Sequence, residues 1–244
     1  MAATRKPALI AAIVVAVLAA TAAWVVLARG PGERHRVGLF TTLPILWNEA
    51  GGVGEMLASK DGPHWARAAL AEEGPVTALD TLTPDTLRGV ERLVLAQPRA
   101  LSPDENVALD NWVRGGGEVL LFADPMLTED SRFPLGDRRR PEGTVLLSPI
   151  LKRWGLELQF DENQPFGKRS VAAQGTAIPV NLPGRFVVLK PAPCKVDGRA
   201  LVARCDVGNG RVLAVADADL LSRDDPDGAG QAALAALMAR AFTD

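Results

Sequence analysis

The chain has 244 residues, of which 48% are hydrophobic and 23% are charged, and its formal net charge is −2. Residues 1–30 hold three basic side chains and no acidic one, so the remainder carries 24 basic and 29 acidic residues, a net charge of −5. This acidic balance argues against nucleic acid as the main partner. The length and apolar content predict a single α/β domain over residues 31–244, behind a hydrophobic segment with its flanks in residues 1–30.

Residues 8–28 form a run of 21 residues without a charge, with basic side chains on both sides. At 1.5 Å per residue, a helix of this length crosses a bilayer core of about 30 Å. Residues 20–22 (ATA) would suit a signal-peptide cleavage site, but the apolar run continues through residues 24–27, which favours an uncleaved anchor. We therefore expect a single-pass protein of the bacterial inner membrane with an extracytoplasmic domain, although the positive-inside bias of the flanks is slight.

The first strand is predicted over residues 37–40, followed by a loop over residues 41–47. Segments that leave the carboxyl end of a first strand often line the ligand crevice of an open α/β sheet. Thr41, Thr42 and Trp47 are therefore candidates for a crevice that binds a ligand or a partner. The alternative is a hydrophobic loop that packs on the domain or lies near the membrane.

The glycine-rich stretch that follows Glu49 has neither of the spacings of a phosphate-binding loop, so we interpret it as backbone flexibility before a short helix. A helix that starts near His64 is predicted to end at Gly74, before a strand over residues 76–79.

Residues 92–125 carry the clearest fold signal. An apolar strand over residues 93–96 precedes a helix that Ser102 caps, and three glycines end that helix before a second apolar strand over residues 118–123. A strand–helix–strand unit of this length predicts a right-handed crossover with two parallel strands. The predicted fold class is a mostly parallel open sheet flanked by helices, flavodoxin-like in kind.

After residue 125, helices and strands are harder to predict from the sequence. Residues 128–143 are predicted to be an exposed loop, in which the three arginines at 138–140 either dock an anionic lipid or acidic partner or are simply solvated. Residues 161–185 are turn-rich and give no clear prediction. The remaining predicted elements are a helix over 148–155, strands over 156–160, 186–189, 201–203 and 211–216, a hairpin turn at 208–210 and a final helix over 231–242.

Polar side chains follow several of the apolar strands. Asp124, Asp217 and Asp219 come directly after two of them, and Gln97 follows a third. Because ligand sites lie at the carboxyl ends of parallel strands, these residues join the candidate crevice for a ligand or partner. The alternative is that the aspartates cap backbone N–H groups in the turns, which is the commoner role.

Groups for catalysis are scarce. The chain has two histidines and no nucleophile-turn motif, so we expect no catalytic residues, no metal site and no cofactor. The two cysteines, Cys194 and Cys205, lie eleven positions apart around Asp197-Gly198 and could form one disulfide across a hairpin if the compartment is oxidising. Two independent buried thiols are the other possibility.

The segments RLVLAQPRALSPDENVALDNWVRGGGEVLLFADP, SPILKRWGLEL and GNGRVLAVADADLL together resemble the extracytoplasmic domain of gliding-motility-type ABC transporter auxiliary proteins. That domain is similar to the class I glutamine amidotransferase-like fold. The resemblance spans roughly residues 90–221 and implies a non-catalytic, membrane-anchored subunit that works with a separate permease and ATPase. Neither Cys194 nor Cys205 follows a strand as an amidotransferase nucleophile does, so that activity is not implied.

Three functions follow as hypotheses. The first is a membrane-anchored accessory or binding subunit of an ABC-type complex, with a small-molecule ligand as a further possibility. The second is a carboxylate-dependent hydrolase or carbohydrate-active enzyme that uses Asp124, Asp217 or Asp219. The third is a structural module whose crevice is closed by the loop over residues 41–47.

Overall fold

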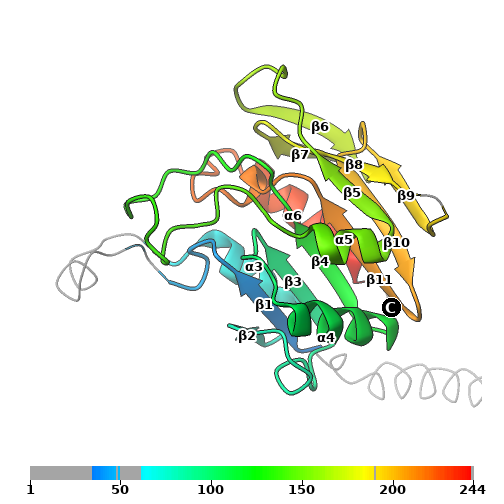
Figure 1. Cartoon of the computed structure of the whole chain (residues 1–244). Helices are drawn as coiled ribbons and strands as arrows, with labels where there is room; N and C mark the ends of the chain where they lie inside the picture. The colour runs from blue at the N-terminus through cyan, green and yellow to red at the C-terminus, as the bar shows by residue number, and fades with distance from the viewer. Residues whose placement is uncertain (1–34, 48, 50–61, 190, 243–244) are drawn as a thin grey trace, which may run out of the picture. The chain divides into compact units, whose positions relative to one another are not determined.

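Seven strands form the central sheet, in the order β2-β1-β3-β4-β11-β10-β9 (Figure 1). The computed structural model describes residues 35–47, 49, 62–189 and 191–242. The first five strands of this order are parallel, and at the other end β10 pairs antiparallel with both β11 and the edge strand β9. The strands of this sheet are β1 (Val37–Thr41), β2 (Val76–Ala78), β3 (Arg92–Ala96), β4 (Glu118–Phe122), β9 (Cys194–Asp197), β10 (Val202–Val207) and β11 (Gly210–Val215).

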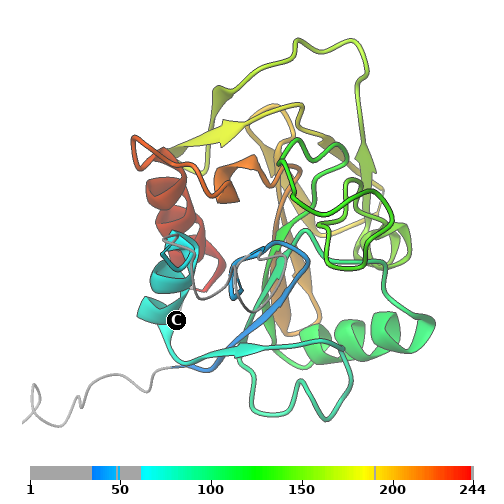
Figure 2. The same ribbon diagram turned by 90° about the vertical axis from the view of Figure 1, so that its left-hand side faces the viewer.

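Helices cover both faces of the sheet. Helices α3 (Trp65–Glu73) and α6 (Ala229–Ala241) pack against each other on one face, and α4 (Pro103–Arg114) and α5 (Ser148–Trp154) pack against each other on the opposite face. Figure 2 shows α3 and α6 together on one side of the strands and α4 on the other. Because both faces are covered, β3 is buried along its whole length, which is why it reads as a continuous apolar run.

The predicted strand–helix–strand unit is confirmed as β3, α4 and β4, with β3 and β4 parallel. The Ser102 hydroxyl accepts from the Glu105 N–H at 3.2 Å, and the Glu105 carboxylate accepts from the Ser102 N–H at 2.8 Å. This reciprocal capping box fixes the start of α4. The chain is thus a mixed α/β protein with a mostly parallel sheet flanked by helices, as the sequence predicts.

The predicted hairpin near the carboxyl end joins β10 to β11 through Gly208 and Asn209. A side chain at Gly210 would meet the backbone oxygens of Val113 and Gly117 within 2.3 Å, so only glycine allows β11 to pass this close to α4. The hairpin therefore depends on close backbone approach as well as on turn chemistry.

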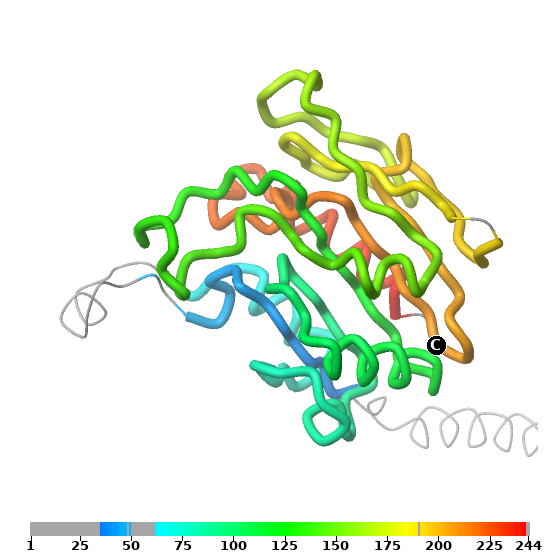
Figure 3. Tube along the Cα trace, viewed as in Figure 1, coloured from blue at the N-terminus to red at the C-terminus, as the bar shows by residue number. Residues whose placement is uncertain are grey.

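Residues 161–185 hold two strands that the sequence analysis did not predict. β6 (Arg169–Ala173) and β7 (Thr176–Val180) form an antiparallel pair, and β9 was also missed. The turn between β6 and β7 uses Gln174 and Gly175, both with positive φ, and Gln-Gly is a weaker turn signal than Asn-Gly. A second small sheet pairs β5 (Leu156–Gln159) with β8 (Arg185–Val188), and these outer strands lie above the end of the main sheet in Figure 3.

The predicted anchor over residues 8–28 and the glycine-rich stretch over residues 50–61 lie outside the described residues. Within the described part of the chain, none of the helices has the length and apolar character needed to cross a bilayer.

Candidate functional site

The strand order creates a reversal point between β1 and β3. The chain moves outward from β1 to β2, whereas β3 leads in the opposite direction to β4 and β11. In open α/β sheets, ligands bind outside the carboxyl ends of the strands at such a reversal. Thr41, Thr42 and Gln97 lie at the carboxyl ends of β1 and β3, and Asp124 and Asp217 follow β4 and β11.

Thr41 and Thr42 join the end of β1 to its neighbours. The Thr41 hydroxyl donates to the Ala96 carbonyl at 2.7 Å and accepts from the Leu43 N–H at 2.9 Å. The Thr42 hydroxyl donates to the Gln97 carbonyl at 2.5 Å and accepts from the Glu142 N–H at 3.1 Å. Both hydroxyls are thus occupied in holding the rim of the crevice together.

Gln97 is fully buried, and its backbone has a φ of 44°, a conformation that is uncommon for a residue with a side chain. Its side-chain amide donates to the carbonyls of Asp124, at 3.0 Å, and Glu142, at 2.8 Å. Its side-chain oxygen accepts from the Asp124 N–H at 2.9 Å. Gln97 therefore connects the end of β3 to the end of β4 and to the loop that covers them.

Asp124 and Asp217 are both fully buried and bind backbone N–H groups through both oxygens. Asp124 accepts from Met126 at 2.8 Å and from Ala218 at 3.2 Å. Asp217 accepts from Asp219 at 2.7 Å and from Asn181 at 3.1 Å. Both aspartates therefore organise the turns after β4 and β11, which is the capping role weighed from the sequence.

The same two carboxyl groups are costly to ionise. Burial raises the pKa of Asp124 to about 7, although its two backbone N–H partners oppose the shift. Burial, followed by the nearby Asp124 charge, raises the pKa of Asp217 well above its usual range. The pair therefore tends to retain a proton at a pH where exposed aspartates are fully ionised.

Asp219 differs from these two because it lines a cavity. It belongs to the short 3-10 helix η1 (Asp219–Leu221), and its Oδ1 lies 3.4 Å from the donating Thr128 hydroxyl. Its Oδ2 is buried and accepts no hydrogen bond from the described residues, but Lys168 Nζ lies 3.8 Å away. Burial raises the pKa of Asp219, and the Lys168 charge partly offsets that effect.

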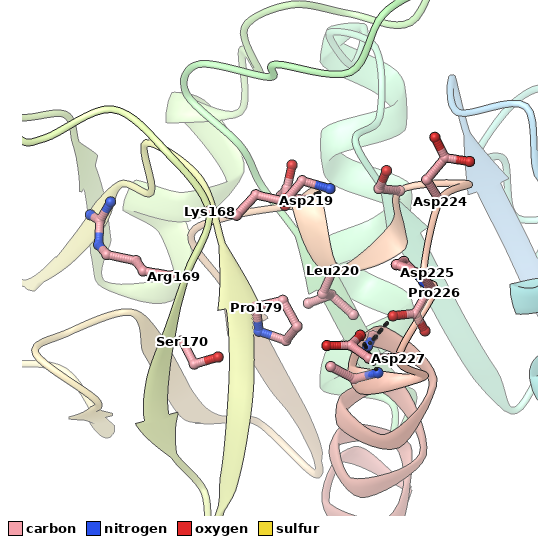
Figure 4. A pocket seen from close by; sticks show the side chains of 13 residues that line it. Lys168, Arg169, Ser170, Pro179, Asp219, Leu220, Asp224, Asp225, Pro226 and Asp227 are labelled. Carbon is pink, nitrogen blue, oxygen red and sulfur yellow. Dashed lines mark hydrogen bonds and ion pairs between the residues drawn. The ribbon is translucent and has the colours of Figure 1, made fainter.

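The cavity beside Asp219 measures about 350 Å³ and lies between β6, β7, η1 and the start of α6. Figure 4 shows Lys168 reaching toward Asp219, while Arg169 points away from it. Asp225 accepts from the N–H groups of Gly230 and Gln231, both at 2.9 Å, and thereby caps the start of α6. The positive end of α6 is thus already occupied by a carboxylate.

A second cavity, of about 360 Å³, lies at the carboxyl end of β1. It is lined by Thr41, Thr42 and Trp47 from one segment and by Arg138 and Arg139 from another. The candidate residues thus lie in three separate locations. Thr41, Thr42 and Trp47 share this cavity, and Asp219 lines the other one. Asp124, Asp217 and Gln97 are buried beneath the rim. In the described part of the chain, no group of three or more histidine, cysteine or acidic side chains is placed to hold a metal ion.

Several residues that line these cavities were not among the sequence candidates. Lys168 lies in the turn-rich region, where nothing in the sequence links it to Asp219, 51 positions later. Arg138 and Arg139 were noted only as part of a charged run. Their position over β1 depends on contacts between distant segments, and no local pattern reports such contacts.

Cys194 and Cys205 face each other directly in the β9–β10 pair and form a disulfide. The two halves of this cross-link are therefore positioned by antiparallel register. A disulfide of this kind is typical of proteins that fold in an oxidising compartment.

No family model matches the chain, and no curated protein matches it. Among solved structures, it is similar to an exo-beta-1,4-mannosidase from Opitutaceae bacterium strain TAV5, with 18% identity, a TM-score of 0.49, and coverage of 85% of this chain and 36% of that one. A putative ThuA-like protein from Bacteroides uniformis has 10% identity, a TM-score of 0.46, and coverage of 86% and 90%. A beta-galactosidase from Bacillus circulans sp. alkalophilus has 13% identity, a TM-score of 0.45, and coverage of 85% and 31%.

The chain thus spans about a third of the length of the two glycosidases. At these identities and TM-scores, the similarities carry no argument about activity, substrate or partner.

Proposed function

We propose that this protein is a membrane-anchored, non-catalytic binding subunit that works outside the cytoplasm with an ABC-type permease and ATPase. The observation that carries the proposal is the use of Asp124 and Asp217. All four of their carboxylate oxygens accept backbone N–H groups, and both side chains are buried. Two of the three acids that a catalytic interpretation would use at the ends of β4 and β11 are thus committed to holding the turns.

Two further features support the location. The uncharged run over residues 8–28 has the length of a membrane anchor, and basic residues flank it. The disulfide between Cys194 and Cys205 suits an oxidising compartment such as the bacterial periplasm. The resemblance to auxiliary proteins of ABC transporters supplies the class of partner.

The test is co-purification of the full chain with a carboxyl-terminal tag from its native membranes in mild detergent. We expect an ATPase and a permease to be recovered in near-stoichiometric amounts. An unrelated single-pass protein with the same tag and expression level is the control. Recovery of the chain alone, with both candidate partners left in the unbound fraction, would contradict the proposal.

Asp219 favours a second candidate function, a carboxylate-dependent hydrolase. A buried carboxyl group with a raised pKa, beside a lysine and in a cavity, is suited to general acid–base chemistry. The test is to incubate the purified full chain with a panel of chromogenic glycosides and esters. Turnover that is lost in Asp219→Asn but retained in Asp224→Asn, a change to an exposed acid of the same cavity, would favour the enzyme.

A further inference from the structure

The cavity at the carboxyl end of β1 occupies the place where this topology puts ligands. It lies beside the reversal between β1 and β3, and its volume of about 360 Å³ falls at the lower end of the range for small-molecule sites. Its lining residues come from two segments that are almost a hundred positions apart in the sequence: Thr41, Thr42, Trp47, Arg138 and Arg139.

The loop that carries the two arginines is fixed to the sheet at several points. Glu142 donates its N–H to the Thr42 hydroxyl at 3.1 Å, and its carbonyl accepts from Gln97 at 2.8 Å. Earlier in the same loop, the Ser131 hydroxyl donates at 2.8 Å and the Arg132 N–H donates at 2.9 Å to the carboxylate of Glu49, a residue that follows β1 in the sequence. The arginines are thus held over the end of β1 by the fold.

The two arginines differ in how their charge is satisfied. Arg139 donates twice to the Asp137 carboxylate, at 2.8 and 3.1 Å, and its guanidinium lies over the Phe133 ring at 4.1 Å. Arg138 forms no ion pair within the described part of the chain. Arg138 therefore gives the cavity a positive charge that is available to a ligand, while Arg139 is a fixed wall.

The remaining lining residues define the rest of the ligand. The hydroxyls of Thr41 and Thr42 are already engaged with backbone groups, so they add little further capacity to donate. Trp47 is 42% exposed and offers a flat apolar surface at the cavity. A guanidinium beside an exposed indole suits an anionic group joined to a ring, since arginine binds carboxylate and phosphate through paired N–H donors and aromatic faces stack on rings.

We propose that this cavity binds a small ring compound that carries a carboxylate or phosphate group, with Arg138 on the anion and Trp47 against the ring. The proposal goes beyond the membrane role proposed above and does not depend on it. Failure to co-purify a transporter would contradict the membrane role but not this ligand site. Failure to bind a ring anion would contradict this ligand site but not the membrane role.

The test is isothermal titration calorimetry on the full chain in detergent, with glucuronate, glucose 6-phosphate, glucose and inorganic phosphate as separate probes. We expect at least one of the two ring anions to bind about tenfold more tightly than both glucose and inorganic phosphate. Arg138→Gln and Trp47→Ala should each weaken that binding by about tenfold. Arg88→Gln is the matched control, because Arg88 is an exposed arginine that precedes β3 and therefore lies toward the amino ends of the parallel strands, away from the cavity at the carboxyl end of β1.

Unchanged thermal unfolding of each variant would show that the fold is intact. The proposal is overturned if neither ring anion binds at concentrations up to about 10 mM, roughly tenfold above a millimolar dissociation constant. The proposal is also overturned if glucose or inorganic phosphate binds as tightly as the ring anions. It is overturned as well if Arg138→Gln binds the ring anions with the affinity of the wild type.

Discussion

The side-chain amide of Gln97 pairs with the backbone of Asp124 in the way that one β-strand pairs with its neighbour. The Gln97 side chain donates to the Asp124 carbonyl at 3.0 Å and accepts from the Asp124 N–H at 2.9 Å. The parallel pairing of β3 with β4 ends at Ala96 and Phe122, so this amide extends the ladder by one step. It does so where the crevice begins, and its second N–H reaches the Glu142 carbonyl of the covering loop.

Replacing Gln97 should therefore destabilise the protein in two distinguishable ways. Gln97→Ala removes three side-chain hydrogen bonds and takes the acceptor away from the buried Asp124 N–H, whereas the Asp124 carbonyl keeps the Val145 N–H at 3.0 Å. We therefore expect a loss of roughly 2–4 kcal/mol in the free energy of unfolding. Gln97→Gly should lose about 0.5–1 kcal/mol less, because glycine adopts the φ of 44° without strain. Urea denaturation of both variants measures the difference. A glycine variant that is less stable than the alanine variant would contradict this interpretation of the turn.

Asp124 should make stability fall as pH rises. Its pKa is about 7 in the folded protein and near 3.8 when exposed, so the folded state holds more protons between these values. The stabilisation is complete below about pH 4 and is lost as pH rises through 7, by at most about 1.4 kcal/mol per pH unit for each proton. Asp124→Asn should cost about 1–3 kcal/mol at low pH, since its amide would face a backbone N–H, and this cost should shrink toward pH 8.

Urea unfolding of the wild type and Asp124→Asn from pH 4.5 to 8 tests this expectation. Asp85→Asn serves as the control because Asp85 is an exposed aspartate whose carboxylate pairs with the exposed Arg88. A constant difference between the wild type and Asp124→Asn across the range would show that Asp124 does not titrate as expected.

His64 should make the protein less stable as pH falls, which is the opposite of the effect expected for Asp124. Its Nδ1 accepts from the Ala66 N–H at 3.1 Å at the start of α3, and its Nε2 lies 3.1 Å from the Leu221 carbonyl. Burial, followed by the Arg223 charge, lowers the pKa of His64 to about 4. Because the unfolded state then binds the proton more readily, stability is lost as pH falls from about 6.5 to 4, by up to about 3 kcal/mol.

His64→Asn offers the matched comparison, since asparagine is a good cap for a helix but does not titrate. We expect the free energy of unfolding of the wild type to fall relative to His64→Asn between pH 6.5 and 4, as measured by urea denaturation. Parallel pH profiles for the two proteins would refute the role of His64.

The disulfide should contribute measurably to stability. Cys194 and Cys205 cross-link β9 to β10 at the edge of the main sheet, and opening the link releases a loop of about a dozen residues. Replacing both cysteines with serine should lower the free energy of unfolding by roughly 2–3 kcal/mol. Chemical denaturation of the oxidised wild type and the double variant measures this. Reaction of the unfolded, unreduced wild type with a thiol reagent would show instead that the link is absent.

The sequence analysis predicted the β3–α4–β4 unit because the signals that define it are local. Apolar runs mark strands that are buried on both faces, and Ser102 and the three glycines mark the two ends of the helix. The hairpin at Gly208 and Asn209 was likewise readable from its turn residues. β6, β7 and β9 were missed because they are short, half-exposed edge pairs whose sequences lack both a continuous apolar run and a strong turn signal.

The α/β class and the acids after the buried strands could be predicted from the sequence, since burial and helix capping leave patterns within a few residues. The roles of those acids became clear only from the packing of the whole domain. Strand order and register placed Thr42 against Glu142, Lys168 beside Asp219 and Cys194 opposite Cys205. Contacts of this kind depend on how distant segments pack, and they divided the candidate residues between buried caps and open cavities.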